Sequence, residues 1–246
     1  MQPTLNHSNS GEFLFRWRSY LPLALVLILL PALPHPHDHF HNAILHYGFE
    51  FTCLLVSVFG LVIRALTIGF VPSGTSGRNT RAQVADSLNT TGVYSICRNP
   101  LYVGNFFMML GVVMFAQSWS ACLIFILAFW LYYERIIAAE ERFLSKKFGD
   151  VYINYLQSVP QFLPKLTGWT RPNMNFSMRT VLRREYSSYF AMIASLCAME
   201  FLGDLLSERQ IELDPYWGTL LAFSAIVYFS LRTMKKKTHL LDVEGR

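Results

Sequence analysis

Long apolar segments separated by polar loops constrain this chain more than any other feature of its sequence. A helix needs about 20 apolar residues to cross the hydrocarbon core of a bilayer. Only 15% of the residues are charged, against about 25% in typical soluble domains. The sequence therefore predicts an all-α integral membrane protein. The expected spans cover about Tyr20–Pro34, Ala43–Val71, two spans within Leu101–Tyr133, Tyr186–Leu206 and Pro215–Leu231.

The run from Leu101 to Tyr133 is too long for one span. The polar residues Gln117 to Ser120 interrupt it, which predicts a helical hairpin with a serine cap. The chain then has about six transmembrane helices. We expect three parts: an N-terminal span and His-rich outer loop (1–44), a core with the functional site (45–165), and a helical hairpin with a basic tail (166–246).

Basic residues concentrate in alternate loops, as they do on the cytoplasmic side of membrane proteins. The N-terminus, the loop 72–99, the region 134–185 and the tail are basic, whereas the intervening loops are not. Both termini are therefore expected in the cytoplasm, in a bacterial inner membrane or the endoplasmic reticulum. This topology explains the net charge of +5 without a nucleic-acid partner.

No metal site is expected from the four cysteines, because their spacings are unrelated. Histidines at positions 35, 37, 39, 41 and 46 leave open a divalent metal on the outer side. Glu50 and Glu200 lie within apolar runs and are functional candidates for that reason, whereas Arg64 is expected to reach the cytoplasmic surface.

The polar stretch from Asn89 to Gly104 carries the first candidate site. Pro100 is suited to the first position of a helix, whose N-terminus attracts anionic groups. Arg98 adds a bidentate donor for a carboxylate or phosphate. Tyr94 and Tyr102 are expected to stack on a flat ring or to donate hydrogen bonds. A simple membrane-surface turn is the alternative interpretation.

A second polar block runs from Glu140 to Pro164 and is expected on the same side of the membrane. Its helix should continue through Phe148 and stop at Gly149. Paired carboxylates can hold ribose hydroxyls, an ammonium group or a sulfonium, although a solvated helix face explains Glu140 and Glu141 equally simply. We expect the two blocks to build one site.

These motifs resemble the isoprenylcysteine carboxyl methyltransferase superfamily, which includes phospholipid methyltransferases. The similar residues are Gly92-Val93-Tyr94, Arg98 to Gly104, Glu140 to Leu144, Phe148-Gly149, Tyr152, Tyr155 and Val159-Pro160. The resemblance implies a membrane enzyme that uses S-adenosylmethionine. The cofactor-binding residues that it implies are Leu88, Asn89, Tyr94, Asn99, Pro100, Leu101, Tyr102 and Glu140.

This sequence departs from the superfamily at two points. Asn99 replaces the usual histidine, and Arg135 lies one residue out of register with an arginine that contacts substrate. Because an anionic oxygen needs no general base, we predict methyl transfer to a phosphate or carboxylate of a lipid or lipid-modified acceptor. The predicted catalytic residues are Arg98, Arg135 and Glu141.

Two alternatives remain open from the sequence. One is an NADPH-dependent sterol or enoyl reductase of the membrane, in which Arg78 and Arg81 would bind the nucleotide phosphate. The other is a non-enzymatic membrane protein that handles metal ions through the His-rich loop.

Overall fold

The computed structural model describes residues 43–72, 74–75, 85–207 and 214–246, and these residues form helices joined by loops. The all-α class is confirmed, because no strand occurs among the described residues. The first expected span, Tyr20–Pro34, lies outside them. The helices are α3 (Ala43–Ile68), η3 (Gly92–Ser95), α4 (Pro100–Met114), α5 (Trp119–Phe148), α6 (Asp150–Ser158), η4 (Leu166–Gly168), α7 (Met178–Ser207) and α8 (Pro215–Lys237).

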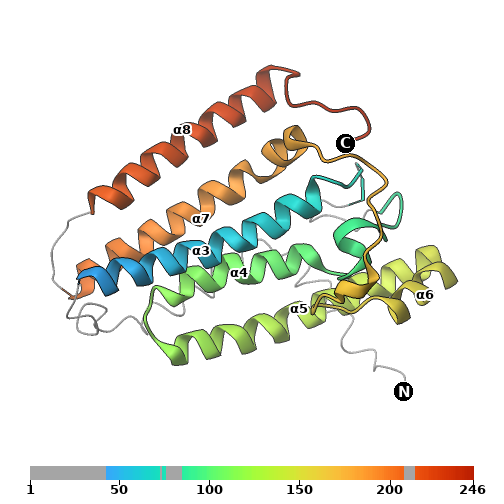
Figure 1. Ribbon diagram of the computed structural model, residues 1–246, viewed down its shortest axis with the longest axis horizontal. Coiled ribbons are helices and arrows are strands. Elements are labelled where there is room, and N and C mark those ends of the chain that lie inside the picture. The colour runs from blue at the N-terminus through green and yellow to red at the C-terminus, as the bar shows by residue number, and fades with distance from the viewer. Residues whose placement is uncertain (1–42, 73, 76–84, 208–213) are drawn as a thin grey trace.

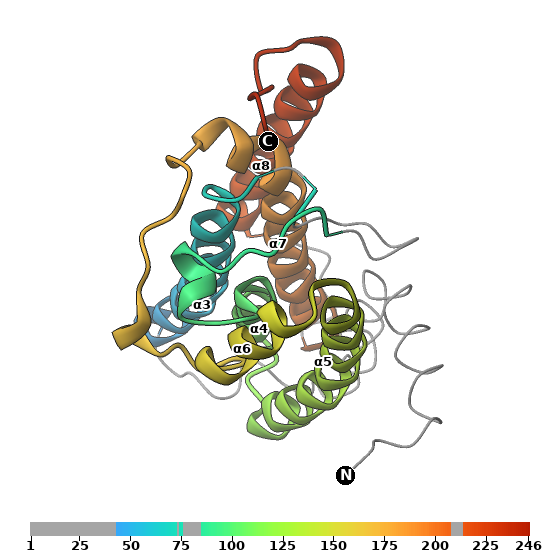
Figure 2. The ribbon, with the colours of Figure 1, turned by 90° about the vertical axis from the view of Figure 1, so that its right-hand side faces the viewer.

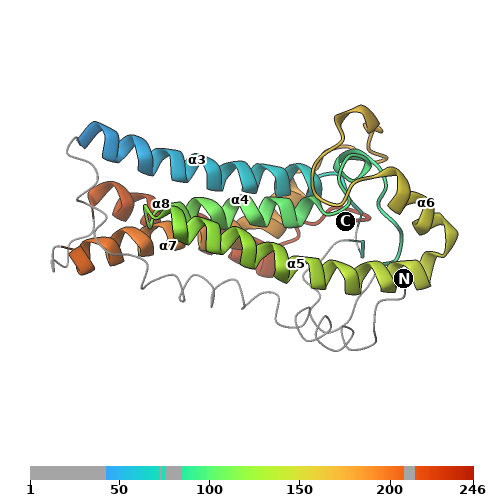
Figure 3. The same ribbon diagram turned by 90° about the horizontal axis from the view of Figure 1, so that it is seen from below.

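The five long helices lie alongside one another in the order α8, α7, α3, α4, α5 (Figure 1). Seen from below, they run along the long axis of the molecule (Figure 3). α6, η3 and the polar segments around them gather at one end of this bundle. The beginnings of α3 and α5 and the end of α7 lie at the opposite end (Figure 1).

Three described helices are long and apolar enough to cross a membrane, and they cover Ile44–Ile68, Trp119–Phe148 and Met178–Leu205. α4 is apolar but has only 15 residues. Apolar side chains on α3 also point outward at helical spacing, as a lipid-facing surface requires. They include Phe51, Leu55, Phe59, Val62 and Leu66. The chain is therefore a membrane protein, while its six spans and their orientation remain predictions.

The predicted break between α4 and α5 is confirmed. α4 ends at Met114, and Ser118 caps α5 by accepting a hydrogen bond from the Ala121 backbone N–H at 3.3 Å. The predicted stop at Gly149 is also confirmed, because this residue ends α5 with a φ of 56°. α7, by contrast, begins at Met178, before the expected Tyr186, so that Glu185 lies inside a helix.

Glycines allow α3 and α4 to approach each other closely. A Cβ atom on Gly60 would lie 2.4 Å from the Gly104 carbonyl oxygen, and one on Gly111 would lie 2.4 Å from the Cys53 carbonyl oxygen. Small residues at an interface of this kind bring two helix backbones together within a membrane. Ser57 Oγ also donates a hydrogen bond to the Met108 carbonyl at 3.0 Å. This contact fixes the register of α4, whose first residues belong to the candidate site.

Candidate functional site

The two polar blocks predicted from the sequence pack against each other at one end of the bundle (Figure 2). Three backbone hydrogen bonds of 2.9 Å join the first block to the second block and to the residues just after it: Arg98 N–H to Pro160 O, Lys165 N–H to Ile96 O, and Gly92 N–H to Thr170 O. Gly92 has a φ of 61°, a conformation that glycine adopts readily. The structure thus brings together segments that lie more than fifty positions apart in the sequence.

Arg98 connects α5 and α6 to the segment before α4. Its Nη1 donates to the carbonyls of Leu156 at 2.6 Å and Val159 at 3.1 Å. Its Nη2 lies 3.0 Å from Glu141 Oε1. Through these contacts Arg98, in the first polar block, holds Glu141 and the end of α6 in place. Their predicted catalytic role remains a prediction, and the buried Nε of Arg98 makes no hydrogen bond among the described residues.

Tyr102 and Glu140 contact each other at the centre of the candidate site. The Tyr102 hydroxyl donates to Glu140 Oε1 at 2.8 Å, which joins α4 to α5. The ring of Tyr102 packs against that of Tyr133, with centroids 4.6 Å apart. Because Glu140 lies two helical turns after Tyr133, the same face of α5 presents both residues to α4. A carboxylate accepts about four hydrogen bonds, so a hydroxyl or ammonium group could bind Glu140 alongside Tyr102.

A chain of polar contacts extends from this centre to α7. Asn105 Nδ2 approaches the Tyr133 hydroxyl at 3.4 Å, and Arg64 Nη1 donates to Asn105 Oδ1 at 2.6 Å. Arg64 also forms a bidentate ion pair with Glu185, in which Nε and Nη2 each lie 2.7 Å from a carboxylate oxygen. The expectation that Arg64 reaches the membrane surface was wrong, since only 8% of this residue is exposed and Glu185 neutralises it within the bundle.

Tyr94 lies close to the same centre. Burial raises the pKa of Tyr94 above its ordinary value, and the negative charge of Glu140 raises this pKa further. The phenol is therefore neutral at physiological pH and keeps a proton that it can donate. The Tyr94 carbonyl accepts a hydrogen bond of 2.7 Å from the Tyr155 hydroxyl, which holds η3 against α6.

The start of α4 is built as predicted, with Pro100 at its first position and fully buried. Asn99 precedes it, and its side chain donates to the Gln161 carbonyl at 3.2 Å instead of capping the helix. Leu101 follows in the first turn and is partly buried. The amide makes this contact without titrating, whereas an imidazole at the same position would change its charge near neutral pH.

The remaining predicted residues lie further from this centre or face elsewhere. Leu88 packs against the cluster formed by Tyr152, Tyr155 and Val159. Asn89 Nδ2 makes a long contact of 3.5 Å to the Thr75 carbonyl. Arg135 is exposed on α5, on a different face from Tyr133, so the structure does not bring it to Tyr102 and Glu140.

Sequence reasoning missed a basic cavity formed by the start of α7, the end of α8 and the tail. Its volume is about 260 Å³, and it is lined by Thr180, Arg183, Arg184, Lys235, Leu241 and Arg246. Arg184 lies near enough to Tyr94 to influence its ionisation. The clustered cations at the start of α7 and in the tail were a visible signal, but nothing in their spacing indicated that these segments would meet.

The fold and this site define a helical membrane protein with a polar site at one end of its bundle. Residues 51–151, which contain every predicted site residue, match the model of the phospholipid methyltransferase family. This match and the relatives below confirm the predicted resemblance to the superfamily of isoprenylcysteine carboxyl and phospholipid methyltransferases. No solved structure matches the chain.

Curated relatives share the central segment. The chain is 38% identical over 82 residues to the cobalt-zinc-cadmium resistance protein CzcN of Cupriavidus metallidurans, covering 33% of this chain and 38% of the relative. It is 38% identical over 77 residues to protein-S-isoprenylcysteine O-methyltransferase of Schizosaccharomyces pombe, covering 31% and 33%. The mouse protein of that name is 30% identical over 119 residues, covering 48% and 42%. The similarity thus spans less than half of each of these relatives.

Proposed function

We propose that this protein is a membrane methyltransferase that moves a methyl group from S-adenosylmethionine to an anionic oxygen of a lipid or lipid-modified acceptor. The observation that carries the proposal is the convergence of Tyr94, Tyr102 and Glu140 at one end of the bundle. All three lie in the segment that matches the phospholipid methyltransferase family. In this proposal the site faces the cytoplasm, as the distribution of basic loops predicts.

S-adenosylmethionine supplies a methyl group on a positively charged sulfur, together with ribose hydroxyls and an ammonium group. In our proposal Glu140 accepts from the hydroxyls or the ammonium, while Tyr102 holds the Glu140 side chain in place. Tyr94 contributes a neutral phenol donor. The other proposed contacts come from Leu88 and Asn89 in the preceding loop and from Asn99, Pro100 and Leu101 at the start of α4.

The basic cavity supports an anionic acceptor. Arg183, Arg184, Lys235 and Arg246 line it, and guanidinium groups bind phosphate and carboxylate oxygens in a bidentate manner. Methyl transfer is an in-line displacement, so orienting the acceptor oxygen about 3 Å from the methyl carbon supplies much of the rate. In our proposal this cavity holds the acceptor headgroup, while its acyl or prenyl chain extends into the bilayer.

Metal handling is the second candidate function. Two relatives are named as metal resistance proteins, one for cobalt, zinc and cadmium and one for nickel, cobalt and cadmium. The NADPH-dependent reductase stays a prediction from the sequence. Arg78 and Arg81, its expected nucleotide contacts, lie outside the described residues.

Transfer of labelled methyl groups tests the proposal. Membranes that contain the protein are incubated with methyl-labelled S-adenosylmethionine, and the lipid and protein fractions are counted. We expect label in an acceptor in the parent and its loss in Glu140→Gln. Lys147→Gln serves as a matched control on the same helix, because Lys147 is exposed in the last turn of α5.

The chemical stability of the label identifies the acceptor. A carboxyl methyl ester releases methanol in mild alkali, whereas a methyl phosphodiester and an N-methyl group do not, and mass spectrometry of the alkali-stable product distinguishes these two. Label that is found only as N-methyl would contradict the anionic acceptor. A folded protein that labels nothing above the level of empty membranes would contradict the methyltransferase itself.

A further inference from the structure

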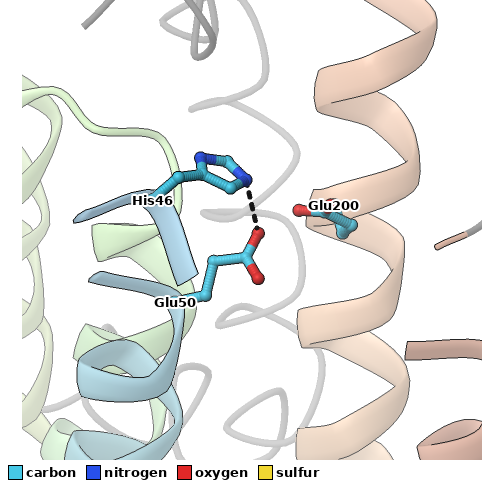
Figure 4. Close-up of side chains that lie close together, drawn as sticks. All are labelled: His46, Glu50 and Glu200. Atoms are coloured by element: carbon cyan, nitrogen blue, oxygen red, sulfur yellow. Dashed lines mark ion pairs between the residues drawn. The ribbon is translucent and has the colours of Figure 1, made fainter. Parts of the chain in front are cut away.

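Three potential metal ligands meet at the end of the bundle opposite the candidate methyl-transfer site. His46 and Glu50 are one helical turn apart on α3, and Glu200 faces them from α7 (Figure 4). His46 Nε2 lies 3.0 Å from Glu50 Oε1. One ligand atom from each of the three residues lies within 4.8 Å of the others.

The two carboxylates of this group are buried with little positive charge to balance them. Glu50 is 5% exposed and Glu200 is 8% exposed. No described lysine or arginine forms an ion pair with either of them. Asp204 and Asp214 add further negative charge near Glu200. Buried like charges at a membrane depth are costly unless a cation compensates for them.

Glu50 presents one carboxylate oxygen that pairs with His46 but makes no well-oriented hydrogen bond among the described residues. Trp217 Nε1 donates to Oε2 at 3.1 Å, whereas Oε1 is buried and makes no hydrogen bond of acceptable geometry within the described part of the chain. Buried polar atoms of this kind are rare and call for an explanation. Oε1 is the oxygen that points toward His46 and Glu200 (Figure 4).

A small cavity lies between these side chains. Its volume is about 10 Å³, and His46, Glu50, Glu200 and Gln117 line it together with apolar residues. This volume suits one water-sized particle. Gln117 Oε1 is a second buried oxygen without a hydrogen bond in the described residues, and its backbone φ of 48° lies in the left-handed region. The turn between α4 and α5 therefore brings Gln117, a potential fourth ligand, to the lining of the cavity.

We infer that His46, Glu50 and Glu200 bind one divalent transition-metal ion of the zinc type, and that the Gln117 amide oxygen or a water completes its coordination. An imidazole with two carboxylates suits zinc and its neighbours better than magnesium, which prefers oxygen ligands and retains its waters. An ion equidistant from three ligand atoms that were all 4.8 Å apart would lie about 2.8 Å from each, so inward shifts of about 0.6–0.8 Å reach zinc distances of about 2.0–2.2 Å.

This site is independent of the proposed methyl transfer. His46, Glu50 and Glu200 all lie outside residues 51–151, the segment that matches the family. Because the ligands come from α3 and α7, the ion would join these helices at one end, as the Arg64–Glu185 ion pair does at the other. Bound metal should therefore stabilise the folded protein.

Zinc titration of the full chain in detergent tests the site. The titration uses a background variant in which alanine replaces His35, His37, His39 and His41. Zinc binding by these histidines then cannot mask binding at His46, Glu50 and Glu200. We expect one zinc equivalent by calorimetry, a zinc-dependent rise in the melting temperature, and no response to magnesium. His46→Ala and Glu200→Gln should each weaken zinc binding at least tenfold, whereas His239→Ala, which is exposed in the tail, should leave it unchanged.

Two results would overturn the inference. One is a folded background protein that binds no zinc. The other is zinc binding that survives both Glu200→Gln and Glu50→Gln. These two variants keep the shape of the side chain, and glutamine at position 50 keeps an acceptor for Trp217, so a loss of folding should not obscure the outcome.

Discussion

Replacing Glu185 by leucine should destabilise the protein strongly. The carboxylate receives two hydrogen bonds of 2.7 Å from Arg64, and the exposed fractions of the two side chains are only 10% and 5%. Without Glu185 the guanidinium of Arg64 stays buried, and among the described side chains only Asn105 still accepts a hydrogen bond from it. Removing one partner of a buried ion pair typically costs about 3–5 kcal/mol of unfolding free energy.

For a chain of this size we expect the melting temperature of Glu185→Leu to fall by about 6–20 °C, because 1 kcal/mol corresponds to about 2–4 °C. The assay is thermal unfolding of the detergent-purified protein. The double variant Arg64→Met/Glu185→Leu removes both charges and should recover most of this loss. Affinity for S-adenosylhomocysteine should also fall in Glu185→Leu, because Arg64 and Asn105 link α7 to Tyr133 and hence to Tyr102.

The matched control breaks a different ion pair of α7. Asp242→Asn removes the contact between Arg183 and Asp242, whose side chains are 36% and 44% exposed. Exposed pairs contribute little, so no resolvable change in the melting temperature is expected. A Glu185→Leu protein that melts like this control would refute the reasoning, as would a double variant that is less stable than the single one.

Three further predictions follow from close contacts in the fold. Gly60→Ala should prevent folding or lower the melting temperature sharply, because its Cβ would lie 2.4 Å from a backbone oxygen, whereas Gly48→Ala on the same helix meets nothing within 4 Å and should be tolerated. Burial raises the pKa of Cys97 to about 11, so its thiolate is scarce at pH 8, and mass spectrometry should find it alkylated by maleimide only after unfolding. Tyr102→Phe removes a bond to a charged group worth about 1.5–3 kcal/mol, and calorimetry should show about tenfold weaker binding of S-adenosylhomocysteine.

Local signals in the sequence predicted the helix boundaries around the site well. A proline at the first position of α4, a serine before α5 and a glycine after it act through the backbone of their own segment, so they can be recognised without the fold. The sequence also predicted that the blocks around Arg98 and Glu140 would face each other. This prediction followed from the expected topology, because loops on the same side of a membrane are neighbours.

Contacts between distant segments could not be predicted in the same way. Arg64 and Glu185 are 121 positions apart, and only the packing of α7 on α3 brings them together. The sequence shows Glu50 and Glu200 as charges within apolar runs, but only the same packing of α7 on α3 places Glu200 close to His46 and Glu50. The hydrogen bonds from Arg98 to the carbonyls of Leu156 and Val159 could not be predicted either, because every residue type has a backbone carbonyl.

Ligand binding tests the central proposal most directly. The detergent-purified chain is heated with S-adenosylhomocysteine, with NADPH and without ligand, and the same series is run on Glu140→Gln. We expect S-adenosylhomocysteine alone to raise the melting temperature of the parent, and the rise to be lost in Glu140→Gln. Stabilisation by NADPH alone would contradict the methyltransferase and favour the reductase. A rise with S-adenosylhomocysteine that Glu140→Gln retains in full would contradict the site proposed around Tyr102 and Glu140.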